Sequence, residues 1–451
     1  MQGNSTITDI PAHQCDPASA LRPVLQPTLL DRFLAVRSMT AALAQPLSAE
    51  DQMVQSCPEA SPVKWHLAHT SWFFETFVLR EFLTGYREFH PDFGWLFNSY
   101  YRSLGEHPEK KLRASFSRPA SSEIYAYRTH VEAAIARLLA SGAAAEALAR
   151  IEMGLHHEQQ HQELIATDIK HALWTNPLHP AYAPPLPRQH ANAATAMNWL
   201  DVDGGLLDIG HSGDTFAFDN ESPRHTVYLA PFQLASRPVT CAEYHAFMQD
   251  DGYSRPELWL SEGWDTMRAE GWQAPLYWRN DGGSWRVYTL RGMRTLSDLE
   301  HTPVCHVSYF EADAYARWFS LQQPGARLAT EAEWEAVAQS ASAGGSFIES
   351  GHLHPATTIS TPGAPAQLFG DVWEWTASAY LGYPGYQASG GALGEYNGKF
   401  MSGQMVLRGG SCVTPATHIR ASYRNFFPPA TRWQFSGIRL ARLLAGKAGH
   451  P

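Results

Sequence analysis

The chain changes from one sequence pattern to another near residue 175, and this change limits its architecture. Before it, apolar residues recur at helical spacing, and after it short strand-like runs alternate with Gly and Pro turns. The helical spacing predicts helices over 28–45, 63–82, 121–141 and 144–173. Four helices with apolar stripes favour an up-and-down four-helix bundle.

A Pro-rich stretch, TNPLHPAYAPPLPRQHANAAT, separates the two halves and is typical of a semi-rigid linker. Three of the few helices expected in the second half begin with a Ser/Thr-x-x-Glu pattern, which is typical of a short, capped helix. We therefore predict an α+β fold with two domains. The predicted parts are an N-terminal tail (1–27), a helical bundle (28–174), the linker (175–195) and a second domain (196–451). The three capping patterns are Thr240–Glu243, Ser308–Glu311 and Thr330–Glu333.

Composition excludes several classes of protein. The 451 residues carry a formal net charge of −10 without any cluster of Lys and Arg, which argues against a nucleic-acid partner. No apolar run reaches the roughly 18 residues of a membrane helix, and no basic segment precedes an apolar core, so we expect neither a membrane span nor a signal peptide. Five cysteines without a CxxC pattern are typical of a reducing cytoplasm.

The segment GLHHEQQHQELIATDIKH, residues 154–171, is the strongest candidate for a functional site. Residues four apart share one face of a helix, so the rings of His157 and His161 can reach one metal ion. His156 lies about 100° around the helix and Glu163 about 200° from His161, so neither joins that face. A helix face whose histidines only pack or meet water remains an alternative for this motif.

A third ligand must come from another helix. The segment WHLAHTSWFFE, residues 65–75, offers His69, with His66 as the competitor. His69 lies among aromatic residues, where an imidazole without a partner would be costly. Three neutral imidazoles can hold zinc with a water or iron(II), and the spacing does not choose between them.

Several motifs resemble known families. HHEQQHQE resembles the HxxxHxE motif of DinB-like bundle domains, and RLATEAEWE, GDVWEW and RGGS resemble the formylglycine-generating-enzyme type of the C-type-lectin-like fold. The segments WHLAHT, LFNSYY, EYNGKFM, VLRGGSC and YRNFFPPATRWQFSGIRLA resemble the ergothioneine-forming sulfoxide synthases, and the likeness runs from about residue 28 to 442. The resemblance implies a DinB-like four-helix bundle followed by a C-type-lectin-like α+β domain.

The resemblance also implies a chemistry. Members of that family are non-haem iron enzymes that join a sulfur donor to the imidazole C2 of hercynine (trimethylhistidine) with O2. The implied cofactor is one Fe(II) per chain, with O2 as co-substrate and hercynine and a chalcogen donor as small-molecule partners.

The resemblance assigns roles to individual residues. The implied iron ligands are His69, His157 and His161, and Gln160 is expected to face the hercynine imidazole. The tyrosines of LFNSYY match a pair that supplies a proton in one branch of the family. Two phenylalanines lie where the second domain closes over the substrate, and arginines are candidates for the hercynine carboxylate by charge. These residues are Tyr100, Tyr101, Phe426, Phe427, Arg420, Arg424 and Arg432.

The donor is a separate question. QSCPEASP, LRASFSRP, RPVTCAEY and RLATEAEWE depart from the commoner forms of the family, whereas the histidines and the tyrosine pair do not. The departures lie outside the metal motif and favour the selenoneine synthase branch, which uses a selenosugar, over the thiol-using branch. Two other hypotheses remain: a formylglycine-generating-type oxidase, for which Cys412 lacks a downstream cysteine, and a non-catalytic module that binds metal or ligand.

Overall fold

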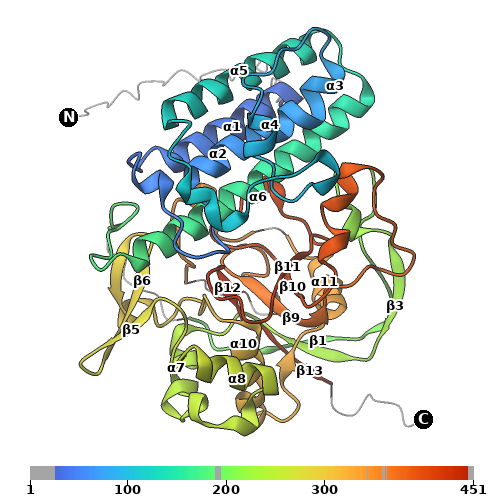
Figure 1. The fold of residues 1–451 in the computed structure, drawn as a ribbon. Coiled ribbons are helices and arrows are strands. Elements are labelled where there is room, and N and C mark those ends of the chain that lie inside the picture. Colours follow the sequence, from blue (N-terminus) through green and yellow to red (C-terminus); the bar gives the residue numbers. More distant parts are fainter. Residues whose placement is uncertain (1–25, 188–193, 343, 358–360, 362, 445–451) are drawn as a thin grey trace, which may run out of the picture.

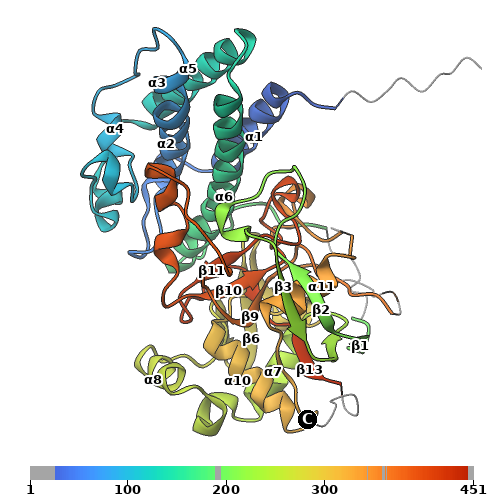
Figure 2. The same cartoon turned by 90° about the vertical axis from the view of Figure 1, so that its right-hand side faces the viewer.

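The computed structural model describes residues 26–187, 194–342, 344–357, 361 and 363–444. A helical bundle stands on a group of small sheets with their own helices (Figures 1 and 2). The predicted tail 1–27 lies almost wholly outside the described residues, as does part of the linker, 188–193. Within the described ranges, no helix is long and apolar enough to cross a membrane.

The four predicted bundle helices are confirmed. They are α1 (Leu29–Ala44), α2 (Val63–Phe74), α5 (Ser121–Ala140) and α6 (Ala145–Thr175). α2 differs from expectation because it continues through a π-helical turn, Glu75–Leu79, into the short α3, Arg80–Phe82. The stretch between α3 and α5 is irregular, with one short helix, α4 (Phe93–Leu96), and two 3-10 turns, η3 (Arg102–Leu104) and η4 (Lys110–Ser115).

Local sequence explains where α1 begins. Thr28 and Asp31 form a capping box, in which each side chain accepts a hydrogen bond from the backbone of the other residue.

Inside the bundle, Arg37 of α1 and Arg128 of α5 both donate to Glu158 of α6, at 2.9 and 3.0 Å. All three of these side chains are buried, so each charge offsets the desolvation cost of the other.

The described residues of the second part form four small sheets. One four-stranded sheet has the order β1-β4-β13-β8, formed by Trp199–Val202, Phe232–Ala235, Leu440–Leu443 and Arg327–Leu328. The other has the order β11-β10-β9-β12, formed by Asn425–Phe427, Met405–Arg408, Trp373–Ala379 and Ser436–Gly437. The smaller sheets pair β2 (Gly205–Ile209) with β3 (His225–Leu229), and β5 (Trp278–Asp281) with β6 (Ser284–Thr289) and β7 (Gly292–Thr295).

Helices of the second part lie below and beside these sheets (Figure 1). They are α7 (Cys241–Gln249), α8 (Ser261–Ala269), α9 (Leu296–Leu299), α10 (Tyr309–Ser320) and α11 (Glu331–Ala338). The three predicted capping boxes are confirmed at the starts of α7, α10 and α11. Local sequence therefore set these helix starts correctly. The domain boundaries at 174 and 196 stay predictions.

The bundle and the second part meet along α6. Glu163 accepts hydrogen bonds from Trp373 Nε1 at 2.8 Å, from Gln434 Nε2 at 2.6 Å and from the hydroxyl of Thr414. Every one of these partners belongs to the second part of the chain. One buried carboxylate on α6 thus joins the bundle to the sheet that contains β9.

The close packing of α6 on α2 gives a stability test at Gly154. A Cβ added there would lie 2.3 Å from Cε1 of Phe74, a side chain that is fully buried and has no room to move. We expect Gly154→Ala to lower the free energy of unfolding by about 1–3 kcal/mol, as overpacking does elsewhere. Urea unfolding measures this loss. In a Phe74→Leu background the same change should cost less, and an equal cost would contradict the proposed contact.

Candidate metal centre and substrate cavity

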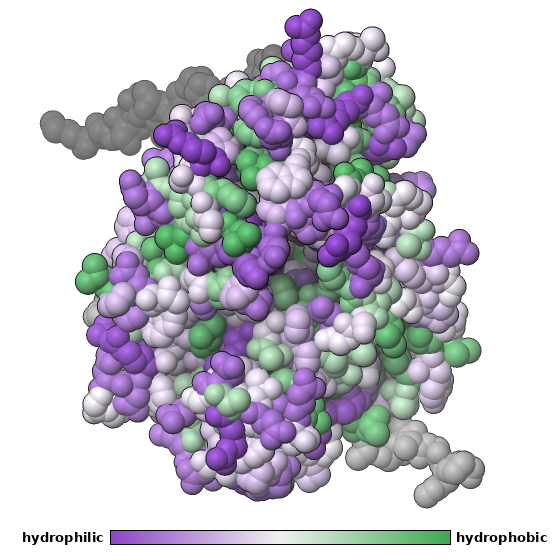
Figure 3. All heavy atoms as spheres, in the orientation of Figure 1, coloured by the Kyte–Doolittle hydropathy of each residue, from purple (hydrophilic) through white to green (hydrophobic). Residues whose placement is uncertain are grey.

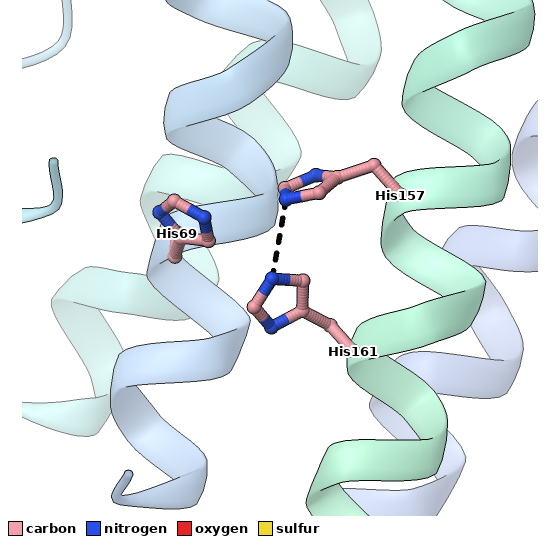
Figure 4. A group of neighbouring side chains, drawn as sticks. All are labelled: His69, His157 and His161. Carbon is pink, nitrogen blue, oxygen red and sulfur yellow. Dashed lines mark hydrogen bonds between the residues drawn. The ribbon is translucent and has the colours of Figure 1, made fainter. Parts of the chain in front are cut away.

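Three buried histidines from two helices converge inside the bundle. His69 comes from α2, and His157 and His161 come from α6 (Figure 4). One ring nitrogen of each lies within 4.8 Å of those of the other two. The structure therefore brings together the three histidines that the sequence analysis proposed as ligands. Among the described residues, no other group of His, Cys, Asp or Glu has this arrangement.

Hydrogen bonds fix which nitrogen two of the rings present. Nδ1 of His69 donates to the Phe97 carbonyl oxygen at 2.7 Å, so its Nε2 carries a free lone pair. Nε2 of His66 lies 3.1 Å from the Asp168 carboxylate, which can only accept, so Nδ1 of His66 is an acceptor. Nδ1 of His161, which lies 2.8 Å from Nδ1 of His66, must then be the donor, so Nε2 of His161 carries the lone pair. This Nε2 lies 3.2 Å from Nε2 of His157, the contact dashed in Figure 4.

Burial keeps these rings uncharged. It lowers the pKa of His157 to about 3 and, together with the nearby His157, lowers the pKa of both His69 and His161 well below the usual value. Neutral imidazoles have the lone pairs that a metal ion requires, and binding would not have to displace protons. The donor set of three neutral nitrogens and no carboxylate fits a divalent transition metal such as iron(II) or zinc.

Neighbouring polar residues of the motif point elsewhere, as the helical geometry predicted. Nδ1 of His156 lies 2.9 Å from Nδ1 of His418, and its ring stacks on Phe216. Glu163 faces the second part of the chain. His66 contacts His161 at 2.8 Å and also lines the cavity, but it is not one of the three converging histidines.

A cavity of about 450 Å³ opens beside the histidines, at the boundary of the two parts. The face shown in Figure 3 is hollowed near its middle, where the bundle meets the sheets. Of the residues predicted from the sequence, the cavity wall contains His157, His161, Tyr100, Gln160, Arg424, Phe426 and Phe427. Further wall residues are Phe218, Tyr396, Asn397, Phe400, Tyr423 and Asn425 from the second part, and Lys110, Arg113 and Asp168 from the first. A volume of this size suits a small molecule (about 300–1,000 Å³ is typical).

The tyrosine pair lies in the loop before η3. The rings of Tyr100 and Tyr101 stack with centres 4.6 Å apart, and Tyr100 lines the cavity. Tyr101 lies behind it and is fully buried, and its hydroxyl has no hydrogen-bond partner. Burial raises the pKa of Tyr100 to about 12 and, with Tyr100 beside it, raises the pKa of Tyr101 well above its usual value. Both phenols therefore remain protonated.

Gln160 is held by two tyrosines that sequence reasoning did not assign. Tyr396 donates to its Oε1, and its Nε2 donates to the Tyr423 hydroxyl at 2.8 Å. Both tyrosines lie in motifs that carried the resemblance, EYNGKFM and YRNFF, but their direction toward α6 depends on how the chain folds back. This arrangement fixes the orientation of the Gln160 amide at the cavity wall.

The arginines proposed for a carboxylate are engaged elsewhere. Arg420 pairs with the buried Glu221 and is not part of the cavity wall. Arg424 reaches the wall, but its guanidinium donates to both oxygens of Glu331 at 2.7 and 3.1 Å. Arg432 donates to Glu311 at 2.9 Å. Each positive charge already has a carboxylate partner, so other groups are better placed to bind an anionic substrate group.

Comparisons with known proteins agree with this architecture. Residues 185–362 and 363–444 match the model of the sulfatase-modifying factor enzyme 1-like domain family. The chain is 31% identical over 450 residues to the hercynine oxygenase of Mycolicibacterium smegmatis, covering 93% of this chain and 99% of that protein. It is 32% identical over 408 residues to the hercynine oxygenase of Mycobacterium tuberculosis, covering 85% of this chain and 91% of that protein. The formylglycine-generating enzyme of Streptomyces coelicolor is 28% identical over 266 residues, covering 50% of this chain and 82% of that protein.

The second part of the chain is therefore a sulfatase-modifying-factor-type domain with a C-type-lectin-like α+β fold, joined to a helical bundle that carries three histidines. The chain belongs to the family of hercynine oxygenases, with which it aligns over as much as 93% of its length. This confirms the family resemblance drawn from the sequence.

The ligand assignment predicts unequal effects for three histidines of the site. His161→Ala should weaken iron(II) binding by more than about 100-fold, because the loss of an outer partner alone costs about 10–100-fold. His66→Phe, which removes such an outer partner, should cost about 10–100-fold. His156→Ala should leave iron content unchanged. Metal analysis after anaerobic loading measures all three, and loss of iron from His156→Ala with retention in His161→Ala would overturn the face assignment.

Proposed function

We propose that the chain is a non-haem iron(II), O2-dependent enzyme that forms a carbon–chalcogen bond at C2 of the hercynine imidazole. The observation that carries this proposal is the trio of neutral imidazoles, two of which, His157 and His161, line a cavity between the bundle and the second domain. His69, His157 and His161 would hold the ion. Iron(II) supplies the one-electron chemistry that activation of O2 requires, which zinc does not.

Gln160 is the residue we assign to the hercynine imidazole. Its amide is fixed by Tyr396 and Tyr423, so its unused N–H and lone pair keep one orientation at the wall. The Tyr423 hydroxyl accepts from Gln160 and retains its own proton for donation. The Gln160 amide and the Tyr423 hydroxyl can therefore orient the hercynine imidazole next to His161. This orientation would position C2 of that ring for reaction.

The trimethylammonium group calls for aromatic contacts, since it has no N–H to donate. Phe426 and Phe427 line the cavity together with Phe218 and Phe400, all from the second domain. Aromatic faces attract a quaternary ammonium electrostatically. We therefore assign this wall to the trimethylammonium group of hercynine, in agreement with the role proposed for the two phenylalanines of YRNFF.

The tyrosine pair is assigned to proton supply. Tyr100 lies at the wall and Tyr101 directly behind it, and both phenols hold their protons because burial raises each pKa. A protonated phenol can donate a hydrogen bond or a proton to oxygen during turnover. The unpartnered hydroxyl of Tyr101 is free for such a role.

The identity of the donor stays open between a selenosugar and a thiol, and we favour the selenosugar because the sequence departures lie outside the metal motif. The wall formed by the first domain is polar, with Lys110, Arg113 and Asp168. Such a wall suits the hydroxyl groups of a sugar and also the charged groups of an amino-acid thiol. All four cysteines among the described residues are free thiols, which supports a reducing cytoplasm as the location.

Turnover with defined donors tests the reaction. Iron(II)-loaded protein, O2 and hercynine are incubated with cysteine, γ-glutamylcysteine or a selenosugar in turn, and products are identified by mass spectrometry. We expect a product joined through C2 only when hercynine, O2 and a donor are all present. Preferential turnover of a thiol would remove the selenium hypothesis, and no product with any donor would contradict the proposed function.

Tyr101→Phe tests proton supply by the tyrosine pair. We expect iron and hercynine binding to stay unchanged while the bond-forming step slows by about 100-fold, within the usual range for a proton donor. Oxidation of the donor alone should rise in proportion. Single-turnover kinetics and product ratios measure both effects. Unchanged rates and ratios in Tyr100→Phe and Tyr101→Phe would rule out the assigned role.

A further inference from the structure

A segment of the second domain reaches across to the loop that carries the tyrosine pair. This clamp segment, residues 391–403, contains the 3-10 turns η9 (Ala392–Glu395) and η10 (Gly398–Phe400). Figures 1 and 2 show it in orange-red, rising beside the bundle next to the loop before α5. Two parts of the chain that are about 300 residues apart in sequence therefore meet at one wall of the cavity.

Glu395 makes the densest set of contacts with that loop. Its carboxylate accepts hydrogen bonds from the backbone N–H groups of Arg102 and Ser103, at 3.2 and 3.0 Å. It also accepts from the Ser103 hydroxyl at 2.6 Å. Burial acts to raise the pKa of Glu395, but the hydrogen bonds from Ser103 and Lys399 outweigh it and hold this pKa at about 2. The carboxylate is therefore charged at neutral pH, which strengthens each of these bonds.

Lys399 completes the contact with Tyr100 itself. Its ammonium pairs with Glu395 at 2.9 Å and donates to the backbone carbonyl of Tyr100 at 2.6 Å. It also lies 4.6 Å from the centre of the Tyr100 ring, where a cation–π attraction operates. The ring of Phe400 meets the same tyrosine edge-on. The pair Glu395–Lys399 thus holds the backbone on both sides of Tyr101.

The clamp segment is also tied to the site and to its own domain. Tyr396, the residue after Glu395, donates to Gln160, which precedes His161. Nδ2 of Asn397 donates to Asp219 at 2.7 Å and anchors the segment on the second domain. One short segment therefore contacts both the tyrosine loop and the residue assigned to the substrate imidazole. A shift of this segment would change the separation between the phenols and the substrate.

We propose that Glu395 is a positioning residue, which holds the loop 98–105 so that Tyr100 and Tyr101 keep their place at the cavity. The proposal rests on the proposed function, because it acts through the role given there to the tyrosine pair. Asn98 holds the same loop from inside the bundle, with bonds of 3.0 and 3.1 Å to the Tyr101 backbone. Glu395 supplies the matching restraint from the other domain.

Glu395→Ala, with Glu109→Ala as its control, tests the proposal in turnover. Glu109 is an exposed glutamate after the same loop, and it pairs with its neighbour Lys111 at 2.7 Å. In Glu395→Ala we expect the bond-forming rate to fall by about tenfold, because the loop loses its hydrogen bonds to the carboxylate and the two tyrosines are less well positioned. Donor-only oxidation should rise, while iron content and the KM for hercynine stay unchanged. Glu395→Gln keeps an acceptor oxygen and should recover part of the rate, and Glu109→Ala should match the wild type.

Hydrogen exchange of the metal-free protein gives a readout independent of activity. The amides of residues 98–105 should exchange faster in Glu395→Ala and unchanged in Glu109→Ala. Unchanged exchange together with an unchanged product ratio in Glu395→Ala would overturn the proposal. If the wild type forms no product from hercynine, the proposed function fails, whereas the exchange comparison still decides whether Glu395 holds the loop.

Discussion

The buried carboxylate of Glu163 is the contact on which the active cavity depends. It is two residues from His161 on the same helix, yet it faces away from the histidines and accepts hydrogen bonds from Trp373, Gln434 and Thr414 of the second domain. Burial raises the pKa of Glu163, and its three donors supply the hydrogen bonds that the buried group requires. α6 is one continuous helix. The hydrogen bonds of Glu163 on one face therefore fix the second domain relative to the histidines on another face. The cavity wall contains residues of both parts, so its shape depends on that alignment.

The same helix is restrained from the bundle side by a different set of charges. Glu158, next to His157, lies between the guanidiniums of Arg37 and Arg128, and none of these groups reaches solvent. His66 and Asp168 support His161 in a chain of hydrogen bonds. In the proposed metal site, such outer contacts would set the tautomer and direction of His161 before a metal binds. This preorganisation by the fold would lower the cost of binding.

The second domain shows how one fold serves different chemistry. It matches the sulfatase-modifying factor family, which includes formylglycine-generating enzymes, but Cys412 in its RGGSC motif is a buried free thiol. In this chain the domain instead supplies aromatic residues, Tyr396 and Tyr423 to a cavity whose histidines belong to the bundle. The function we propose depends on the site at the junction and not on either fold alone.

The sequence by itself determined the local features, because they depend on residues close together in the chain. The i, i+4 spacing put His157 and His161 on one face and turned His156 and Glu163 away, and the Ser/Thr-x-x-Glu patterns set three helix starts. His69 needed the family resemblance to be preferred over His66, since both lie on the same helix. Only the tertiary structure decided which distant residues meet: Arg420 and Arg424 are neutralised by Glu221 and Glu331, while Tyr396 and Glu395 reach the bundle. The spacing of residues along the chain cannot predict a contact with a residue about 200 positions away. Such a contact depends on how the two domains pack and on which buried charges need a partner.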